Sequence, residues 1–285
     1  DCGLGKTIQY LEWANRVVGH SGRDVLILTP LAVAEQTVRE AAKFDEPCKL
    51  VRHESDANNE SPSVYVTNYE KLEHFSPSFI ERLGGIVLDE SSILKSMDGK
   101  TRTSLIETFS ATPYRLCCTA TPAPNDLMEL GNHAEFLGVM RAVEMLSMFF
   151  DHDGGETSKW ILKPHAEIPF WKWVCSWAVY IRKPSDIGFS DEGYDLPPLR
   201  IHDITIASNG DDVARTGELF SGGSLSLMDR RSARRETIDA RVSETARIVN
   251  ASVGPFVVWC DLNAESEALA KAIDGAVEIR GSQTE

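Results

Sequence analysis

The feature that most constrains the fold is a series of short apolar runs that alternate with stretches of helical periodicity. Residues 25–28 are all apolar, a pattern typical of a strand that is buried on both faces. The other expected strands are 64–67, 86–88 and 114–119, and the expected helices are 8–14, 31–44, 77–83 and 101–109. Strands that alternate with helices predict an α/β fold with a parallel sheet and crossover helices.

The composition narrows the classes of protein to which this chain can belong. With 42% hydrophobic and 25% charged residues it is typical of a globular protein, which excludes wholesale disorder. The net charge of −14 excludes a protein that holds nucleic acid by bulk charge alone. No apolar run approaches the ~20 residues of a membrane span, so no membrane partner is expected. Six scattered cysteines without a CxxC pair argue against a zinc site or a disulfide framework, and favour a cytoplasmic location.

Changes in residue composition and periodicity along the chain predict three parts. The expected parts are a sheet domain at 1–138, a helical connector or insertion at 139–245, and the beginning of a second sheet domain at 246–285. Within the last two parts we expect a helix at 227–250, strands at 256–260 and 276–279, and a helix at 264–273. The arginines of the first of these helices form either a phosphate-binding patch or, as we favour, a solvated and partly paired face.

The connector is rich in aromatic residues. It holds four of the chain's six tryptophans, which are Trp160, Trp171, Trp173 and Trp177. One interpretation is an aromatic ladder on which bases stack. The interpretation that we favour is a helical appendage that packs on the sheet domain, with a turn at 151–155.

A glycine-rich stretch precedes the first expected helix. It consists of Gly3, Leu4, Gly5, Lys6 and Thr7. Glycines let backbone N–H groups close around a phosphate, the lysine would reach the β- and γ-phosphates, and the threonine hydroxyl would bind Mg²⁺. The alternative is an ordinary glycine-containing turn, because the full GxxxxGK[ST] motif needs one more residue at its start.

An acidic pair follows the expected strand at 86–88. Asp89 and Glu90 would emerge at the carboxyl end of that strand, where open α/β sheets bind ligands. Asp89 would hold Mg²⁺, partly through water, and Glu90 would orient and deprotonate a water for in-line attack at a γ-phosphate. Acidic pairs are also common in loops, but a phosphate-binding stretch earlier in the chain favours the functional interpretation.

A third motif ends the next expected strand. Thr119, Ala120 and Thr121 precede a proline, and this short stretch is a weak signal by itself. Because it comes third in the right order, we interpret it as a coupling motif that could contact both a nucleotide and a moving partner.

Together these motifs resemble those of the Swi/Snf-type branch of superfamily-two DEAD/DEAH-box helicases and translocases. The stretches that carry the resemblance are 1–7, 28–30, 66–70, 88–92, 119–125 and 257–263. The Asp-Glu-Ser-Ser-Ile-Leu-Lys stretch and the Trp-Cys-Asp-Leu-Asn stretch are most similar to phage and prophage helicase proteins. The resemblance therefore implies a bacterial or phage-infected cell as the setting.

The resemblance implies an ATP-dependent DNA helicase or double-stranded DNA translocase, with RecA-like domains that use ATP and Mg²⁺. It implies backbone contacts to nucleic acid from Thr29, Pro30, Thr67 and Asn68. The adenine-reading segment would lie before the first residue and the arginine fingers after the last, so we expect a fragment truncated at both ends, which hydrolyses ATP at a negligible rate alone.

Two features modify these expectations. Ser92 stands where many relatives have His or Gln, so the polar link between the acidic pair and the coupling motif should be shorter or absent. The acidic net charge predicts weak and strongly salt-dependent binding of nucleic acid, through local positive potential and neutral donors.

Other functions remain open at this stage. A DEAD-box-like RNA helicase shares the first motifs, and a non-catalytic recruitment module could keep the fold without turnover. A P-loop kinase would need an acceptor site and would not explain the coupling motif. The sequence does not identify protein partners.

Overall fold

The computed structural model of the chain describes residues 2–57, 61–97, 99–153, 156–206, 234–235 and 237–280. By their internal contacts the residues divide into two compact units, Asp1–Leu196 and Pro197–Glu285. None of the helices in the described part of the chain combines the length and the apolar character needed to cross a lipid bilayer.

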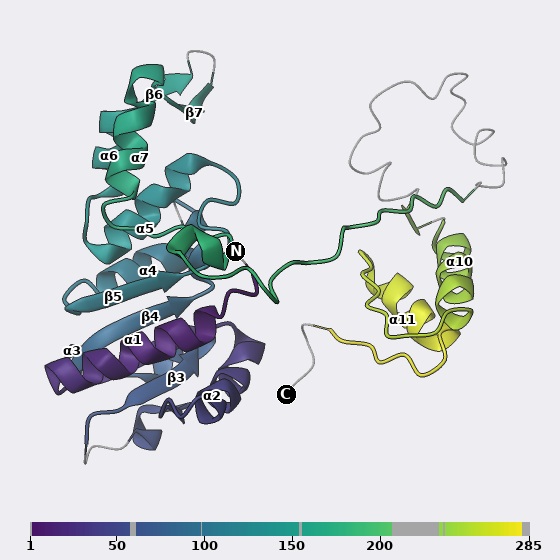
Figure 1. The fold of residues 1–285 in the computed structure, drawn as a ribbon, viewed down its shortest axis with the longest axis horizontal. Coiled ribbons are helices and arrows are strands. Elements are labelled where there is room, and N and C mark those ends of the chain that lie inside the picture. Colours follow the sequence, from purple (N-terminus) through teal and green to yellow (C-terminus); the bar gives the residue numbers. More distant parts are fainter. Residues whose placement is uncertain are drawn as a thin grey trace. The chain divides into compact units, whose positions relative to one another are not determined.

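The first unit contains a five-stranded parallel sheet (Figure 1). Its strands are β1 (Asp24–Thr29), β2 (Lys49–Leu50), β3 (Val64–Asn68), β4 (Leu83–Asp89) and β5 (Tyr114–Cys118). They lie in the order β2-β3-β1-β4-β5, and every pairing is parallel. The prediction of a parallel α/β sheet is confirmed.

Helices cover both faces of this sheet, because successive strand residues point to opposite sides. Val25 and Ile27 pack with α1 (Lys6–Ser21) and α2 (Ala34–Lys43). Leu26 and Leu28 pack on the other side with α3 (Pro77–Glu81), α4 (Lys100–Thr108) and α5 (Leu130–Leu137). The short 3-10 helices of the chain are η1 (Leu31–Val33), η2 (Glu54–Asp56), η3 (Tyr69–His74), η4 (Ser91–Lys95), η5 (Leu127–Glu129), η6 (Pro164–Ala166) and η7 (Pro184–Ile187).

The strand register brings the predicted motifs to one edge of the sheet. Thr29 pairs with Asn68 at the ends of β1 and β3, and Asp89 pairs with Cys118 at the ends of β4 and β5. All four carboxyl ends therefore lie along the same edge, where parallel sheets bind ligands.

The connector contains a β-hairpin, which corrects the expectation of an all-helical segment. It comprises α6 (Ala142–Phe149), β6 (Phe150–Asp153), β7 (Glu156–Leu162) and α7 (Glu167–Val174). The expected turn at 151–155 was wrong in its first half, because 151–153 belong to β6 and pair antiparallel with β7. Two aspartates had suggested a turn, but cross-strand pairing overrides such local preferences.

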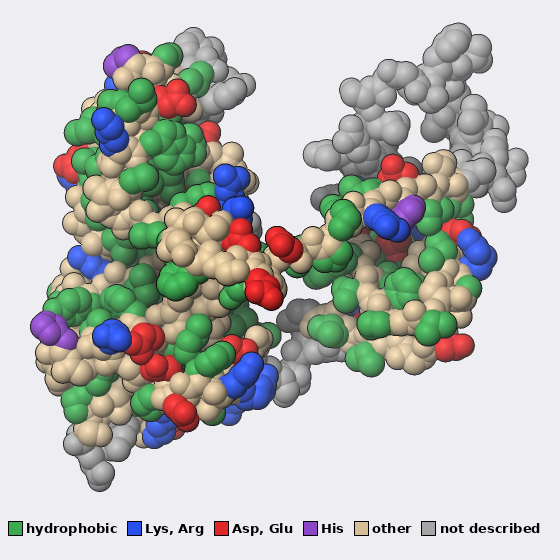
Figure 2. All heavy atoms as spheres, viewed as in Figure 1, with side chains coloured by type: hydrophobic (Ala, Val, Ile, Leu, Met, Phe, Trp, Pro, Cys, Tyr) green, Lys and Arg blue, Asp and Glu red, His purple; other side chains and the backbone are tan. Residues whose placement is uncertain are grey.

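Most aromatic side chains of the connector pack against one another. Phe149 lies 5.5 Å from both Phe170 and Trp173, and Trp173 lies 5.4 Å from Trp177, measured between ring centroids. Figure 2 shows hydrophobic side chains gathered over α6 and α7. This packing favours an appendage with its own small core over an open ladder of rings.

The second unit is described by two helices, α10 (Ile238–Asn250) and α11 (Asn263–Ala272). The expected helix at 264–273 is confirmed. The expected helix at 227–250 is confirmed over 238–250, while 227–233 and 236 lie outside the described residues. The strands expected at 256–260 and 276–279 are not formed, and Val257 and Trp259 are exposed. An apolar run becomes a strand only when a neighbour accepts its hydrogen bonds, and the described residues of this unit supply none.

Two helical glycines should respond in opposite ways to alanine. A methyl group on Gly131 of α5 would lie 3.3 Å from the backbone of Ala142, so Gly131→Ala should lower the free energy of unfolding by about 1–3 kcal/mol. Gly19 of α1 has open space at the same position, so Gly19→Ala should raise it by about 0.5–1 kcal/mol. Urea denaturation of both variants tests this, and equal effects would contradict the described contact between α5 and α6.

Candidate functional site

The glycine-rich stretch forms a tight turn at the start of α1. Gly3 and Gly5 have φ angles of 76° and 70°, a region that favours glycine, and the helix begins at Lys6. The Gln9 side chain donates to the Leu4 carbonyl at 2.9 Å, which ties the turn to the helix. The turn therefore places backbone N–H groups and a helix N-terminus together, the arrangement that binds phosphate.

Asp89 lies buried at the end of β4, close to this helix. It is 6% exposed, and the Tyr10 hydroxyl of α1 lies 3.4 Å from its Oδ2. The same hydroxyl lies 3.1 Å from Thr37 Oγ1 on α2. These contacts bring α1, α2 and the acidic pair into one polar cluster.

The electrostatics of this cluster favour a bound cation. Burial raises the pKa of the Asp89 carboxyl to about 6, and the adjacent Glu90 carboxylate adds to this rise. Hydrogen bonds from the Glu90 backbone and Tyr10 and the positive charge of Lys6 act in the opposite direction. A buried carboxylate beside a second carboxylate is the oxygen donor set that Mg²⁺ prefers, so the residues fit that ion.

Glu90 adopts a left-handed backbone conformation, with φ 49° and ψ 52°. The Glu90 Oε2 atom lies 3.4 Å from Thr119 Oγ1. Thr119 Oγ1 in turn accepts a hydrogen bond from Thr121 N at 3.1 Å. The acidic pair and the coupling motif are thus joined directly, while Ser92 donates to the carbonyl oxygen of Glu90. The polar link that Ser92 led us to expect as shorter or absent is therefore present, as a direct contact between Glu90 and Thr119.

The residues predicted to contact nucleic acid lie at the ends of β1 and β3. Thr29 is fully buried and its hydroxyl donates to the Thr67 carbonyl at 3.4 Å, while Pro30 directly after it is partly exposed. Thr67 is also buried, and its hydroxyl has no hydrogen-bond partner among the residues that the structure describes. Asn68 accepts from Lys71 N at 3.2 Å and caps η3. A phosphate contact from either threonine hydroxyl needs the strand ends to open.

Several residues of the site carry no signal that sequence reasoning used. Tyr10 stands three residues after Thr7, so helical spacing could have placed it near the phosphate-binding turn. Tyr69, the first residue of η3 and part of the 66–70 stretch, donates to the Asp89 carbonyl at 2.7 Å, a contact that the resemblance did not indicate. Ser91 and His133 form a buried contact that no spacing rule indicates.

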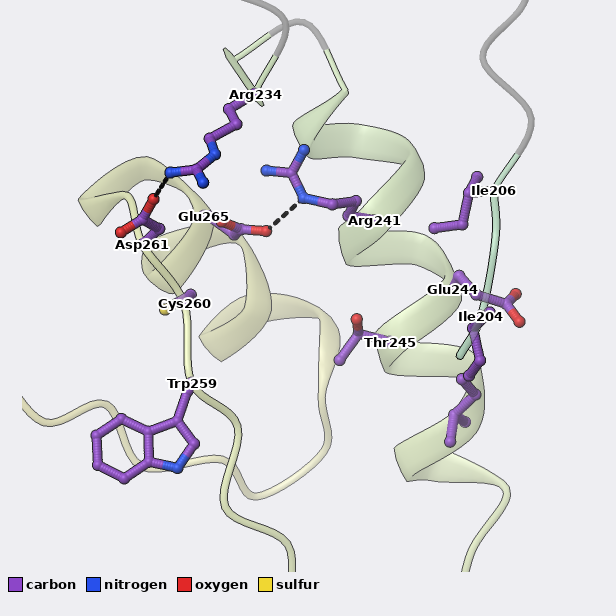
Figure 3. Close-up of a pocket in the computed structure, with 11 residues that line it drawn as sticks. Ile204, Ile206, Arg234, Arg241, Glu244, Thr245, Trp259, Cys260, Asp261 and Glu265 are labelled. Carbon is purple, nitrogen blue, oxygen red and sulfur yellow. Dashed lines mark hydrogen bonds and ion pairs between the residues drawn. The ribbon is translucent and has the colours of Figure 1, made fainter. Parts of the chain in front are cut away.

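A separate cavity of about 670 Å³ lies in the second unit (Figure 3). Trp259 lies at its rim, and an ion pair joins Arg241 Nε to Glu265 Oε1 at 2.9 Å. None of the predicted site residues lines this cavity. The lining of this cavity includes Trp259, Cys260 and Asp261 of the 257–263 stretch, and no residue of the glycine-rich turn, the acidic pair or the coupling motif.

A model of the SNF2-related domain matches residues 1–151, which is more than half of the chain. The chain belongs to the SNF2-related domain family. The matched region of the SNF2-related chain includes the sheet, the glycine-rich turn, the acidic pair and the coupling motif.

Among characterised proteins, the SNF2-related chain is similar to the SWI/SNF chromatin-remodeling complex subunit snf22 of Schizosaccharomyces pombe. The two are 26% identical over 144 residues, which are 46% of this chain and 8% of that protein.

Among solved structures it is similar to the UvsW helicase from bacteriophage T4, with 13% identity and a TM-score of 0.38 over 47% of this chain and 48% of that one. A second is the Sulfolobus solfataricus SWI2/SNF2 ATPase core in complex with dsDNA, with 25% identity and a TM-score of 0.42 over 52% and 33%. The chain spans less than half the length of each of these relatives.

The raised pKa of Asp89 predicts a pH-dependent stability in the absence of divalent cations. Unfolding lowers the pKa from about 6 to its ordinary value of 3.8, so folded protein loses stability as pH rises through this window. Asp89→Asn removes the ionisation, so its free energy of unfolding relative to wild type should rise by up to about 3 kcal/mol between pH 4 and pH 7.

Urea denaturation at several pH values in EDTA measures this difference. Glu73→Gln, at an exposed carboxyl on η3, controls for the loss of one charge. Parallel pH profiles for Asp89→Asn and wild type would contradict the assignment.

Proposed function

We propose that the protein is an ATP-dependent DNA translocase or helicase, in which ATP hydrolysis drives movement on the nucleic acid. The observation that carries the proposal is the Lys6, Asp89 and Glu90 cluster, in which a phosphate-binding turn lies beside two carboxylates. Membership of the SNF2-related domain family supports the same activity.

In the proposed hydrolysis, different residues of the first unit have different roles. Backbone N–H groups of the turn and Lys6 bind the phosphates, while Thr7 and Asp89 hold Mg²⁺, which neutralises charge on the phosphates. Glu90 orients the attacking water and accepts its proton. The coupling motif at Thr119 senses this event through its contact with the Glu90 carboxylate.

Movement on DNA requires a second set of contacts. Thr29, Pro30, Thr67 and Asn68 lie at the sheet edge that also holds the acidic pair. Once the strand ends open, the two threonine hydroxyls and the Asn68 amide could act as neutral donors, which position a strand without reading its sequence, and Pro30 could contact it only by packing. The relative named as a chromatin-remodelling subunit supports DNA as the partner. In this proposal residues 1–138 form the first motor domain, 139–245 the connector, and 246–285 the beginning of the second.

Substitution of the catalytic cluster tests the proposal in the full-length protein. Lys6→Ala removes a phosphate ligand and Glu90→Gln removes the base, so each should reduce DNA-stimulated ATP hydrolysis by at least about 100-fold. Lys172→Ala and Glu73→Gln make the same changes at exposed positions and should leave the rate unchanged. Retained turnover in either cluster variant would remove the assignment.

The same assay separates the alternative functions. Stimulation of wild-type hydrolysis by RNA and not by DNA would indicate an RNA helicase. Binding of DNA without nucleotide hydrolysis would indicate a non-catalytic recruitment module. Either result would replace the proposed translocase.

A further inference from the structure

A buried histidine contacts the turn that follows the acidic pair. His133 on α5 is 3% exposed, and its Nε2 lies 3.2 Å from the hydroxyl of Ser91, which is fully buried. Its Nδ1 lies 3.5 Å from the carbonyl oxygen of Glu129, one helical turn earlier. Burial lowers the pKa of His133, so the ring is uncharged near neutral pH and offers one donor and one acceptor. Nε2 therefore connects α5 with the turn, while Nδ1 is held by the backbone at the start of α5.

The turn that this histidine contacts contains an unfavourable backbone conformation. Glu90 has a positive φ of 49°, which is rare for a residue with a side chain. Such a conformation persists only where the surrounding structure holds it. The contact at Ser91 fixes the backbone on one side of Glu90, and the contact at Thr119 fixes its carboxylate.

Glu129, the last residue of η5 and the N-cap of α5, holds the loop that carries the coupling motif. The Glu129 carboxylate is buried and accepts from Asn125 Nδ2 at 2.7 Å and from Asn125 N at 3.3 Å. Residues four apart share one face of a helix, so Glu129 and His133 face the two loops together. A third residue of this helix, Asn132, donates to the Leu94 carbonyl of η4 at 2.7 Å.

We propose that His133 is a positioning residue for Glu90. By holding Ser91, it keeps the left-handed turn closed and the Glu90 carboxylate directed at Thr119, where it can orient water. The inference rests on the proposed function, because Glu90 is the base only in a hydrolytic site. It adds a residue of α5 to the machinery, outside every motif that the sequence indicates.

Amide hydrogen exchange tests the structural part without nucleotide. His133→Leu replaces the imidazole ring with an apolar side chain that cannot hydrogen-bond, and Ser91→Ala removes the hydroxyl on the other side of the contact. Each should accelerate exchange at 91–94 by about tenfold, as expected for the loss of one buried hydrogen bond. The double variant should resemble His133→Leu alone, since both substitutions remove the same contact.

Steady-state ATP hydrolysis by the full-length protein tests the catalytic part. His133→Leu should lower kcat by about tenfold, while KM stays within about twofold, because the turn acts on the attacking water and not on nucleotide binding. His133→Gln can still reach Ser91 and should recover most of the rate.

Phe136→Leu is the matched control. Phe136 is a buried residue of the same helix that packs in the hydrophobic core, so its substitution destabilises α5 and leaves the side chains of Ser91 and His133 in place. It should leave local exchange at 91–94 and kcat near wild type after correction for the fraction folded.

The outcomes separate the two proposals. If Phe136→Leu matches His133→Leu in exchange and kcat, or if the effects of Ser91→Ala and His133→Leu add fully, the positioning role is overturned. If wild-type protein hydrolyses no ATP, the proposed function fails, and the positioning of a catalytic base fails with it even if exchange still reports the contact. Slow wild-type exchange with an accelerated His133→Leu variant and lowered kcat would support both.

Discussion

The contact between the Tyr10 hydroxyl and the Asp89 carboxylate joins the two parts of the site. Tyr10 lies in α1, which follows the glycine-rich turn, and Asp89 is the last residue of the fully buried strand β4. Without this contact the turn and the acidic pair would be separate features of the chain. The parallel sheet makes the contact possible, because it delivers all strand ends to one edge.

The burial of the Asp89 carboxylate costs free energy, because it removes a charge from water. Asp89 is among the few acidic side chains buried in the described residues, although the chain carries 43 Asp and Glu residues in all. Its burial destabilises the ionised form, as its raised pKa shows, and that cost is offset when a cation binds. In the proposed function, this loss of stability is the cost of a site that can hold Mg²⁺, a common pattern at functional sites.

Strong apolar periodicity explains which elements could be predicted from the sequence. Strands β1, β3 and β4 and helix α1 follow from runs and spacings whose burial the structure confirms, and β5 forms as predicted although its residues are exposed or only partly buried. The β6–β7 hairpin could not be predicted, because its pairing depends on a partner strand rather than on local residues. The apolar run at 256–260 has the composition of a strand without a neighbour, so it stays unpaired.

The sequence indicates candidate ligands for the site but not the residues that support them. Glycines, a lysine and an acidic pair carry chemistry in their residue types, so a sequence pattern can identify them. Ser91 and His133 are ordinary residues whose meeting depends on how α5 packs beside η4, and no periodicity encodes that. Buried polar contacts between distant segments are visible only after folding.

The backbone at Glu90 restricts which side chains the position can carry. β-Branched residues such as Val, Ile and Thr are strongly disfavoured at a positive φ, whereas Gly, Asn and Asp tolerate it. Substitutions at this position therefore divide into two kinds, those that remove the carboxylate and leave the turn intact, and those that reshape the turn itself. A library of substitutions at this single codon would separate chemical from conformational loss.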